Sequence, residues 1–387
     1  MGVIDCYAMR RATTAALLLL SCLPIGGCSM FRHVDVTPLA TGSGRPSNVA
    51  AFVAVSDDDV GLSELSPASF HVYENGQLVP FEQTELTLLD PNLVAGPHVV
   101  LLVDLSTAQA STPRSVVAKA VQGFVQKVTR REAVSVLAYD GSVDLVPIGA
   151  FPRGDRAVTL AAIEGYTPRD PSRNLNGAVT AGLAKLTQAL AQNGKQIKLG
   201  TLVIYAGGPD LANRVDADEA HDAVWESPYD VIGVGVGERA DAVENFARSG
   251  LIRAQADNTL PIAFEEAADK TIEQLEKHYL VSYCSPARDG IRQLRLEVSY
   301  TNKAGDEQHG DFEMEFSAKS FGPGCNSQSP PRLTLVAKAA PARKKDSDLT
   351  KPRPGEAAQG SEAPGSSEHD RGEDAPVAPP DKSGYAK

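Results

Sequence analysis

Both ends of the chain alternate hydrophobic and polar residues with a period of two, which is the pattern of strands with one buried face. Leu294, Leu296 and Val298, for example, alternate with charged or hydroxyl-bearing residues. Near the other end, Asn75 and Gly76 separate two short apolar runs, and this pair favours a two-residue hairpin turn. The strands predicted in this way cover residues 48–56, 70–73, 77–81 and 84–89, and then 279–285, 291–300 and 310–317.

Between these ends, short apolar runs alternate with amphipathic helices. The helix predicted over residues 115–128 places Val117, Val121 and Phe124 on one face. Because strand and helix alternate, we expect a mostly parallel sheet with helices on both faces. The run 143–148 follows a tight turn and must return antiparallel. The predicted strands are 98–104, 133–139, 143–148, 199–205, 229–236 and 252–255, and the predicted helices are 115–128, 175–190, 216–225, 240–248 and 262–277.

The strands at the two ends are predicted to form one β-sandwich into which the α/β segment is inserted. The three strands after His278 do not readily make a stable sheet of their own, so they need partners from elsewhere. The predicted organisation is therefore residues 48–96 and 279–325 as the two parts of the sandwich, with residues 97–278 as the α/β domain.

A carboxylate ends the first strand of the α/β domain. The Val- and Leu-rich run closes at Asp104, and Ser106 and Thr107 follow it. Open α/β sheets bind ligands at the carboxyl ends of their strands, so this step predicts a binding site. The alternative is that Asp104 and Ser106 only cap the loop and the next helix.

Charge and composition narrow the classes of partner. The net charge of -12 and the sequence pI near 5.1 argue against a general affinity for nucleic acid or anionic membrane surfaces. Residues 326–387 are rich in Pro, Ala, Gly, Ser and mixed charge, which predicts a disordered tail. Its run Arg343-Lys344-Lys345 is interpreted as solvated charge, with contact to an acidic envelope polymer as the alternative.

The N-terminus has the pattern of a targeting segment. Arg10 and Arg11 precede an apolar stretch that ends in Ile25-Gly26-Gly27-Cys28, and this resembles the lipobox of bacterial lipoproteins. The resemblance implies a signal peptide over residues 1–27, an acyl chain such as palmitate on Cys28, and a tether over 28–47. Ser29, in place of the Asp that signals inner-membrane retention, favours the outer membrane of a two-membrane envelope. Cys22 as the lipidated residue, an uncleaved anchor and a start at Met9 are the alternatives.

Removal or lipidation of the first three cysteines leaves two in an exported chain. These are Cys284 and Cys325, and in an oxidising compartment they are expected to form a disulfide. Two separate free thiols are the alternative. No cysteine or histidine spacing indicates a zinc site.

The order of elements, the early antiparallel hairpin and the step Asp104-Leu105-Ser106 resemble the von Willebrand factor A domain, over roughly residues 97–278. The run 173–178 adds to the likeness. The resemblance implies a doubly wound, Rossmann-like fold and a domain that binds proteins. In that family an Asp-x-Ser-x-Ser loop, a distant Thr and a distant Asp hold a divalent cation, which binds a carboxylate of the partner.

This chain departs from the family's metal-ion-dependent adhesion site at three positions. Ala108 replaces the second Ser, Arg173 aligns with the distant Thr, and Ala206 aligns with the distant Asp. We therefore expect a degenerate site in which the Arg173 guanidinium satisfies Asp104 and no metal or other cofactor is bound. Ser172 and Asp210 are alternative ligands if the alignment shifts. If an ion such as Mg²⁺ binds after all, Asp104 and Ser106 are the expected ligands.

One glycine motif points toward an enzyme. Gly235 and Gly237 follow a strand and open a helix, and Asp257 lies about twenty residues on, as in a dinucleotide fingerprint. Glycines that end a strand before a helix explain the motif equally well. The function expected from the sequence is an envelope lipoprotein that binds a protein partner and is not an enzyme. A divalent-cation-dependent adhesin and a cofactor-binding enzyme are the alternatives.

Overall fold

The computed structural model describes residues 34–58, 60–108, 112–155 and 161–336. The predicted signal peptide, Cys28 and the tail from residue 337 onward lie outside these ranges, so their interpretation stays a prediction. Within the described residues, no helix combines the length and the apolar character needed to cross a membrane.

The α/β domain contains a six-stranded sheet in the order β12-β11-β10-β7-β8-β9. All neighbouring pairs are parallel except β8 with β9, so the predicted antiparallel return is confirmed. The strands are β7 (Ala95–Asp104), β8 (Val134–Tyr139), β9 (Val146–Phe151), β10 (Ile197–Tyr205), β11 (Asp230–Val236) and β12 (Leu251–Ala254).

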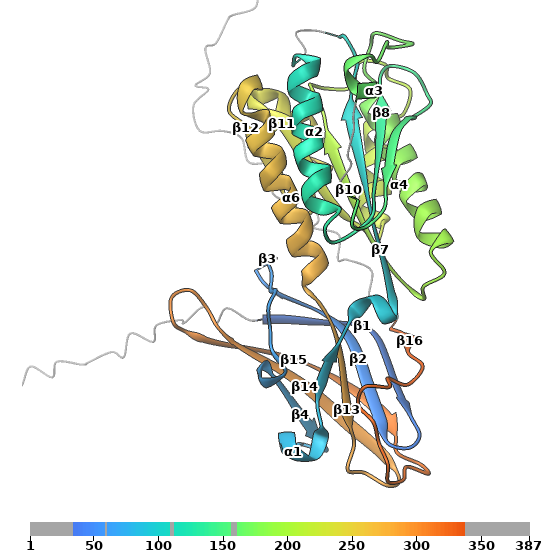
Figure 1. Cartoon of the computed structure of the whole chain (residues 1–387), viewed down its shortest axis with the longest axis vertical. Coiled ribbons are helices and arrows are strands. Elements are labelled where there is room, and N and C mark those ends of the chain that lie inside the picture. Colours follow the sequence, from blue (N-terminus) through green and yellow to red (C-terminus); the bar gives the residue numbers. More distant parts are fainter. Residues whose placement is uncertain (1–33, 59, 109–111, 156–160, 337–387) are drawn as a thin grey trace, which may run out of the picture. The chain divides into compact units, whose positions relative to one another are not determined.

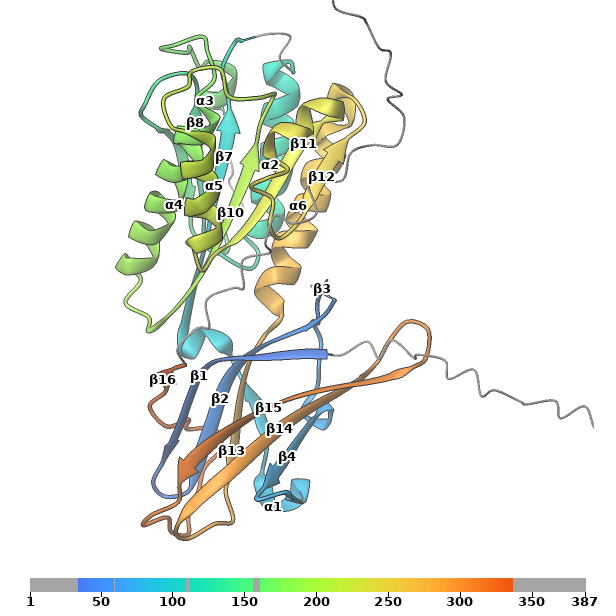
Figure 2. The same cartoon turned by 180° about the vertical axis from the view of Figure 1, so that it is seen from behind.

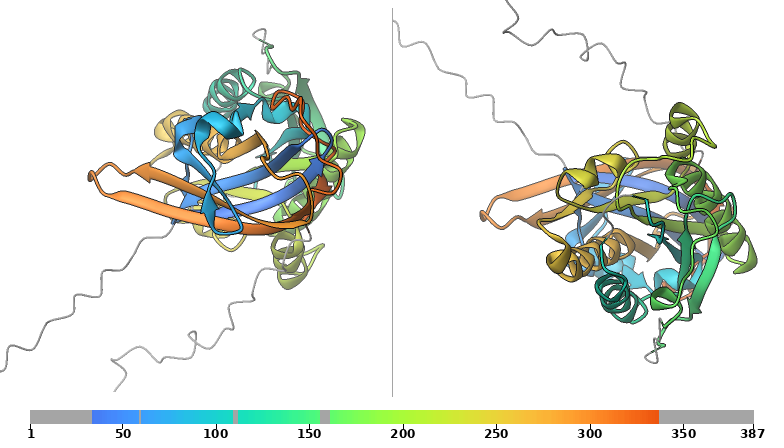
Figure 3. Two further views of the ribbon diagram at one scale, coloured as in Figure 1. Left: turned by 90° about the horizontal axis from the view of Figure 1, so that it is seen from below. Right: turned by 90° about the horizontal axis from the view of Figure 1, so that it is seen from above.

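Helices cover both faces of this sheet (Figures 1, 2 and 3). Alternate residues of β7 point to opposite layers, because successive side chains of a strand lie on opposite faces. Leu101 packs into one core with α2 (Arg114–Val128) and α6 (Leu260–Glu276). Leu102 packs into the other core with α4 (Leu175–Gln192) and α5 (Ala217–Glu226). A short α3 (Ala161–Glu164) contacts α2.

The remaining strands form two facing sheets. The first has the order β16-β1-β2-β13-β6, with β3 also paired to β2, and the second has the order β15-β14-β4-β5. Their bounds are β1 (Val34–Gly44), β2 (Asn48–Asp57), β3 (Val60–Gly61), β4 (Phe70–Glu74), β5 (Gln77–Leu78), β6 (Thr87–Leu89), β13 (His278–Cys284), β14 (Ile291–Thr301), β15 (Glu307–Ser317) and β16 (Thr334–Leu335).

Strands from both ends of the chain pair within this sandwich. β13, which follows α6 after one residue, lies against β2, and β14 lies against β4. Val53 of one sheet and Val72 and Leu296 of the other share a single core. The predicted architecture, an α/β domain inserted into a β-sandwich, is therefore confirmed.

Three sequence-based boundaries are wrong. Residues 34–44 are not tether but β1, whose Val34, Val36 and Ala40 are buried against the sandwich. The tail does not begin at residue 326, because Leu333 is buried and β16 pairs with β1. The helix expected over 240–248 is instead a 3₁₀ helix, η3 (Gly237–Val243), which begins directly after β11.

Smaller differences concern the loops around the sandwich. The second arm of the hairpin is only the two-residue β5, and the chain then forms α1 (Phe81–Thr84). Single 3₁₀ turns add η1 (Pro67–Ser69), η2 (Pro91–Leu93) and η4 (Asp257–Thr259).

Cys284 and Cys325 form the predicted disulfide, with Cα atoms 5.8 Å apart. Cys284 ends β13, and Cys325 lies in the segment between β15 and β16. The bond therefore ties that segment to the end of β13 in the first sheet.

Candidate functional site

The sheet order places a crevice between the ends of β7 and β10. From β7 the chain moves outward to β8 and β9, and then it returns to β10 and moves outward in the opposite direction. Such a reversal opens a crevice at the carboxyl ends of the two central strands, and ligands of open α/β sheets bind there. Asp104 is the last residue of β7, and Gly207 follows the end of β10.

Asp104 lies at this crevice with a side chain that is only 3% exposed. Its Oδ1 accepts a hydrogen bond from the Ser106 amide at 2.9 Å. Its Oδ2 accepts one from the Gly207 amide at 2.8 Å and another from Nε of Arg173. Both carboxylate oxygens are therefore already bonded within the protein.

Arg173 is the largest fully buried side chain of the described residues, with 1% of the side chain exposed. Besides the Asp104 pair, Nη1 donates to the Pro209 carbonyl and Nη2 to the Ala108 carbonyl, each at 3.2 Å. A Cβ added to Gly208 would lie 2.8 Å from Nη1. The glycine there makes room for the guanidinium, so the segment after β10 is shaped around Arg173.

The other aligned positions supply no side-chain oxygen toward Asp104. Ala206 is completely buried in the core beneath α4, and its amide bonds to the Val234 carbonyl. Ala108 contributes only its carbonyl, to Arg173. The structure brings together four of the five predicted corner residues: Asp104, Ser106, Ala108 and Arg173. The fifth, Ala206, lies in the core.

The two alternative ligands make other contacts. The Ser172 hydroxyl donates to Asp170 at 2.7 Å. Asp210 accepts the amides of Asn176 and Asn213 at 3.0 and 2.8 Å. Ser172 bonds within its own loop, and Asp210 bonds to the first turn of α4 and to its own loop, so neither contact involves Asp104.

These residues do not fit a divalent cation. Mg²⁺ and Mn²⁺ need several oxygen ligands, whereas here the carboxylate is bonded by two amides and a guanidinium of fixed charge. Across the described part of the chain, there is also no group of three or more His, Cys, Asp or Glu side chains placed to hold a metal.

A second buried carboxylate, that of Asp140 just after β8, holds the loop that carries Arg173. Its Oδ2 accepts the Tyr166 hydroxyl at 2.9 Å and the Arg169 amide at 2.8 Å, and Oδ1 accepts the Ser142 amide at 2.7 Å. Burial alone would raise the pKa of Asp140, but these hydrogen bonds outweigh it and lower that pKa. The Asn174 amide, next to Arg173, donates to the Asp140 carbonyl at 2.9 Å.

Sequence reasoning missed Arg114, which lies beside the corner. It is the first residue of α2, and its Nη2 donates to the Leu105 carbonyl at 2.7 Å. A cation is electrostatically disfavoured at a helix N-terminus. An arginine at that position, with no acidic residue in the first turn, is the signal that would have pointed to it.

The glycine motif has a packing explanation. A Cβ on Gly235 would lie 2.4 Å from the Cα of Ala240, so this glycine permits η3 to lie against β11. Asp257 pairs with Arg239 and accepts the Thr112 hydroxyl at 2.6 Å.

Taken together, the strand order, the antiparallel edge strand and the crevice at β7 and β10 define a doubly wound α/β domain, which is the fold class implied by the resemblance to the von Willebrand factor A domain. No protein-family model matches the sequence, and no curated protein matches it.

Several solved structures show low similarity. A von Willebrand factor type A protein from Catenulispora acidiphila is 11% identical over 74% of this chain and 74% of its own, with a TM-score of 0.38. Proximal thread matrix protein 1 from the mussel byssus is 15% identical over 46% of this chain and 48% of its own, with a TM-score of 0.36. Manganese-loaded TRAP protein from Plasmodium vivax is 14% identical over 65% of this chain and 99% of its own, with a TM-score of 0.33.

The chain spans about half the length of the byssus protein, 48%.

Proposed function

We propose that this chain is a lipid-anchored envelope protein that binds a protein partner at the carboxyl edge of its α/β sheet without a divalent cation. The observation that supports it is the buried pair of Arg173 and Asp104. It occupies the corner where the family resemblance implies a cation, so recognition there depends on protein groups alone.

Side chains around the crevice support a binding role for this edge. Val143, in the loop after β8, is 67% exposed, and Leu211, in the loop after β10, is 38% exposed. Loops held by a rigid sheet commonly carry binding residues, and exposed apolar side chains favour contact with another protein. Catalysis is not part of the proposal.

Photo-crosslinking in the intact envelope tests this surface. Benzoylphenylalanine at position Leu211 or Val143 is expected to give a defined protein adduct, and the same group at Leu78, which is 55% exposed on the sandwich, serves as the matched control. The adducts should persist with a chelator present. Equal adducts from Leu78 would contradict the binding surface, and adducts lost on chelation would favour the cation-dependent adhesin.

Calorimetric titration tests directly whether the protein binds a divalent cation. We expect the unmodified protein to show no saturable binding of Mn²⁺ or Mg²⁺, because Asp104 is already neutralised by Arg173. Micromolar binding that disappears in Asp104→Ala would overturn the metal-independent function.

The anchor rests on the lipobox and needs its own test. Mass spectrometry of the envelope protein should find an acylated Cys28, and Cys28→Ala should leave the membrane fraction. Unchanged acylation or fractionation of the variant would refute the anchor.

A further inference from the structure

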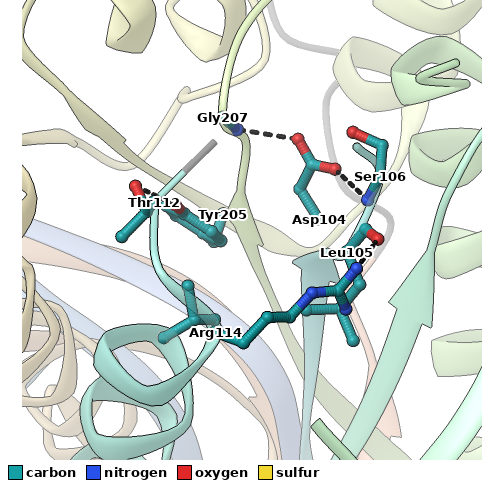
Figure 4. Close-up of a pocket in the computed structure, with 8 residues that line it drawn as sticks. Asp104, Leu105, Ser106, Thr112, Arg114, Tyr205 and Gly207 are labelled. Carbon is teal, nitrogen blue, oxygen red and sulfur yellow. Dashed lines mark hydrogen bonds between the residues drawn. The ribbon is translucent and has the colours of Figure 1, made fainter. Parts of the chain in front are cut away.

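A small cavity lies directly beside the Asp104 corner, at the start of α2 (Figure 4). Its walls include Asp104, Ser106, Thr112, Arg114 and Gly207. The volume of about 10 Å³ matches the space taken by one water-sized group. The cavity therefore admits a single buried oxygen atom rather than a whole molecule.

Most polar groups around the cavity already have partners. Both oxygens of Asp104 are bonded, as described above. The Thr112 hydroxyl accepts from Tyr205 at 3.1 Å and donates to Asp257 at 2.6 Å. These groups are not free to bind a ligand.

Two buried polar atoms of the residues that line the cavity have no hydrogen-bond partner among the described residues. They are Oγ of Ser106 and Nη1 of Arg114, and both residues line the cavity. Ser106 is only 4% exposed. An unpaired buried polar atom costs about 1–3 kcal/mol, so an arrangement that leaves two of them on one cavity is expected to serve a ligand.

The guanidinium of Arg114 is fixed in position. Its Nη2 donates to the Leu105 carbonyl at 2.7 Å, and its centre lies 5.5 Å from the ring centroid of Tyr166. No described carboxylate forms an ion pair with it, whereas Arg173 and Arg239 pair with Asp104 and Asp257. The positive end of the α2 dipole adds to the positive potential at this guanidinium.

We propose that this cavity binds one carboxylate oxygen of the protein partner, with Nη1 of Arg114 and the Ser106 hydroxyl as the donors. The proposal rests on the function proposed above and names the chemistry of the partner. The space accommodates one oxygen of the carboxylate. The Asp104 carboxylate in the wall disfavours a doubly charged phosphate more than a singly charged carboxylate.

The test uses acetate as the probe and the purified chain from Ser29 onward. Amide resonances of Ser106 and Gly207 are followed by NMR during titration with acetate, phosphate or chloride at equal ionic strength. Acetate should produce saturable shifts. Arg114→Met and Ser106→Ala should weaken acetate binding about tenfold or more, and the matched control Arg169→Met, whose side chain is 63% exposed on a neighbouring loop, should leave it unchanged.

A second variant and a crystal structure test the proposal if Arg114→Met does not fold. If Arg114→Met does not fold, Arg114→Lys retains the charge without the fork and should still weaken acetate binding. A crystal grown in acetate should show a carboxylate oxygen within hydrogen-bond distance of Nη1. A water alone in the cavity, or phosphate binding as tight as acetate binding, would overturn the proposal.

The crosslinking experiment separates this inference from the proposed function. If Leu211 adducts form but acetate does not bind, the carboxylate site is refuted and the binding surface stands. If acetate binds and no adducts form, the surface is refuted and the anion site stands. If adducts persist in Arg114→Met after acetate binding is lost, the partner does not supply the carboxylate.

Discussion

The carboxyl ends of β7 and β8 each place a buried aspartate in the protein, and the two carboxylates are stabilised by different partners. The two strands are neighbours in the sheet, and each is followed or ended by a buried aspartate, Asp104 or Asp140. Asp104 is bonded by a guanidinium and two amides, whereas Asp140 is bonded by two amides and a phenol. A buried carboxylate at this edge therefore does not need a counter-charge, so the guanidinium at Asp104 is a specific feature of that position.

The largest expected effect comes from breaking the charged pair. Arg173→Met leaves the Asp104 carboxylate buried without its cation, and loss of one partner of a buried pair costs about 3–5 kcal/mol. Urea denaturation should show this decrease in the free energy of unfolding. The exposed control Arg169→Met should change it by less than about 0.5 kcal/mol.

The double variant Asp104→Asn/Arg173→Met sharpens this result, because it removes the charge as well as its partner. It should be more stable than Arg173→Met alone. Equal stability of the single and double variants would show that the carboxylate is solvated once Arg173 is gone.

Asp140 is stabilised by neutral hydrogen-bond donors, so changing it should reduce the free energy of unfolding by less than breaking the Arg173–Asp104 pair does. Asp140→Asn keeps the shape but turns an amide group toward the donors from Tyr166 and Arg169, so we expect a loss of about 2 kcal/mol at neutral pH. Urea denaturation of the two proteins gives the difference. A loss as large as that of Arg173→Met would remove the distinction between the two sites.

The loss of unfolding free energy in Asp140→Asn is expected to depend on pH. Burial opposes ionisation of Asp140, but the hydrogen bonds prevail and lower its folded-state pKa below the unfolded value of about 3.9. Its ionisation therefore stabilises the fold above that value, and the contribution disappears as the pH falls through the folded-state pKa. The difference in unfolding free energy between the unmodified protein and Asp140→Asn should shrink below pH ~4; a difference that grows on acidification would contradict it.

The smallest effect is expected at Tyr166. Tyr166→Phe removes one of the hydrogen bonds to Asp140 but keeps the ring beside Arg114, so the expected loss is about 1 kcal/mol. Thermal unfolding measures the loss, and acetate binding should be retained. Loss of acetate binding would show that the phenol, rather than the ring, positions Arg114.

The sequence predicts the α/β domain and the insertion well because both depend on repeated patterns. Val99, Leu101 and Val103 face one core and Val100 and Leu102 the other, so a continuous apolar run is enough to identify β7 as a central parallel strand. The sandwich strand β1 was missed because Thr, Gly and Pro interrupt its pattern. Its burial depends on pairing with β2 and on contact with β15, which no local pattern contains.

The residues of the candidate site could be predicted from the sequence only in part. Asp104 and Ser106 follow a clear strand, and the family resemblance brings in Arg173. The cavity residue Arg114 gives no signal in hydrophobic periodicity, since its importance depends on an unpaired nitrogen and a neighbouring hydroxyl. Such a feature appears only when the ends of β7 and α2 are placed together.

The insertion of one domain into another also has a consequence for the order of events during synthesis. β2 ends at Asp57, and its partner β13 begins at His278, 221 positions later. At about 5–20 residues per second, this interval lasts roughly 10–40 s. Throughout that time the apolar strand β2 lacks its neighbour β13. The whole α/β domain is synthesised in the same interval and is free to fold. The early strands are therefore the part of the nascent chain that most needs protection from aggregation.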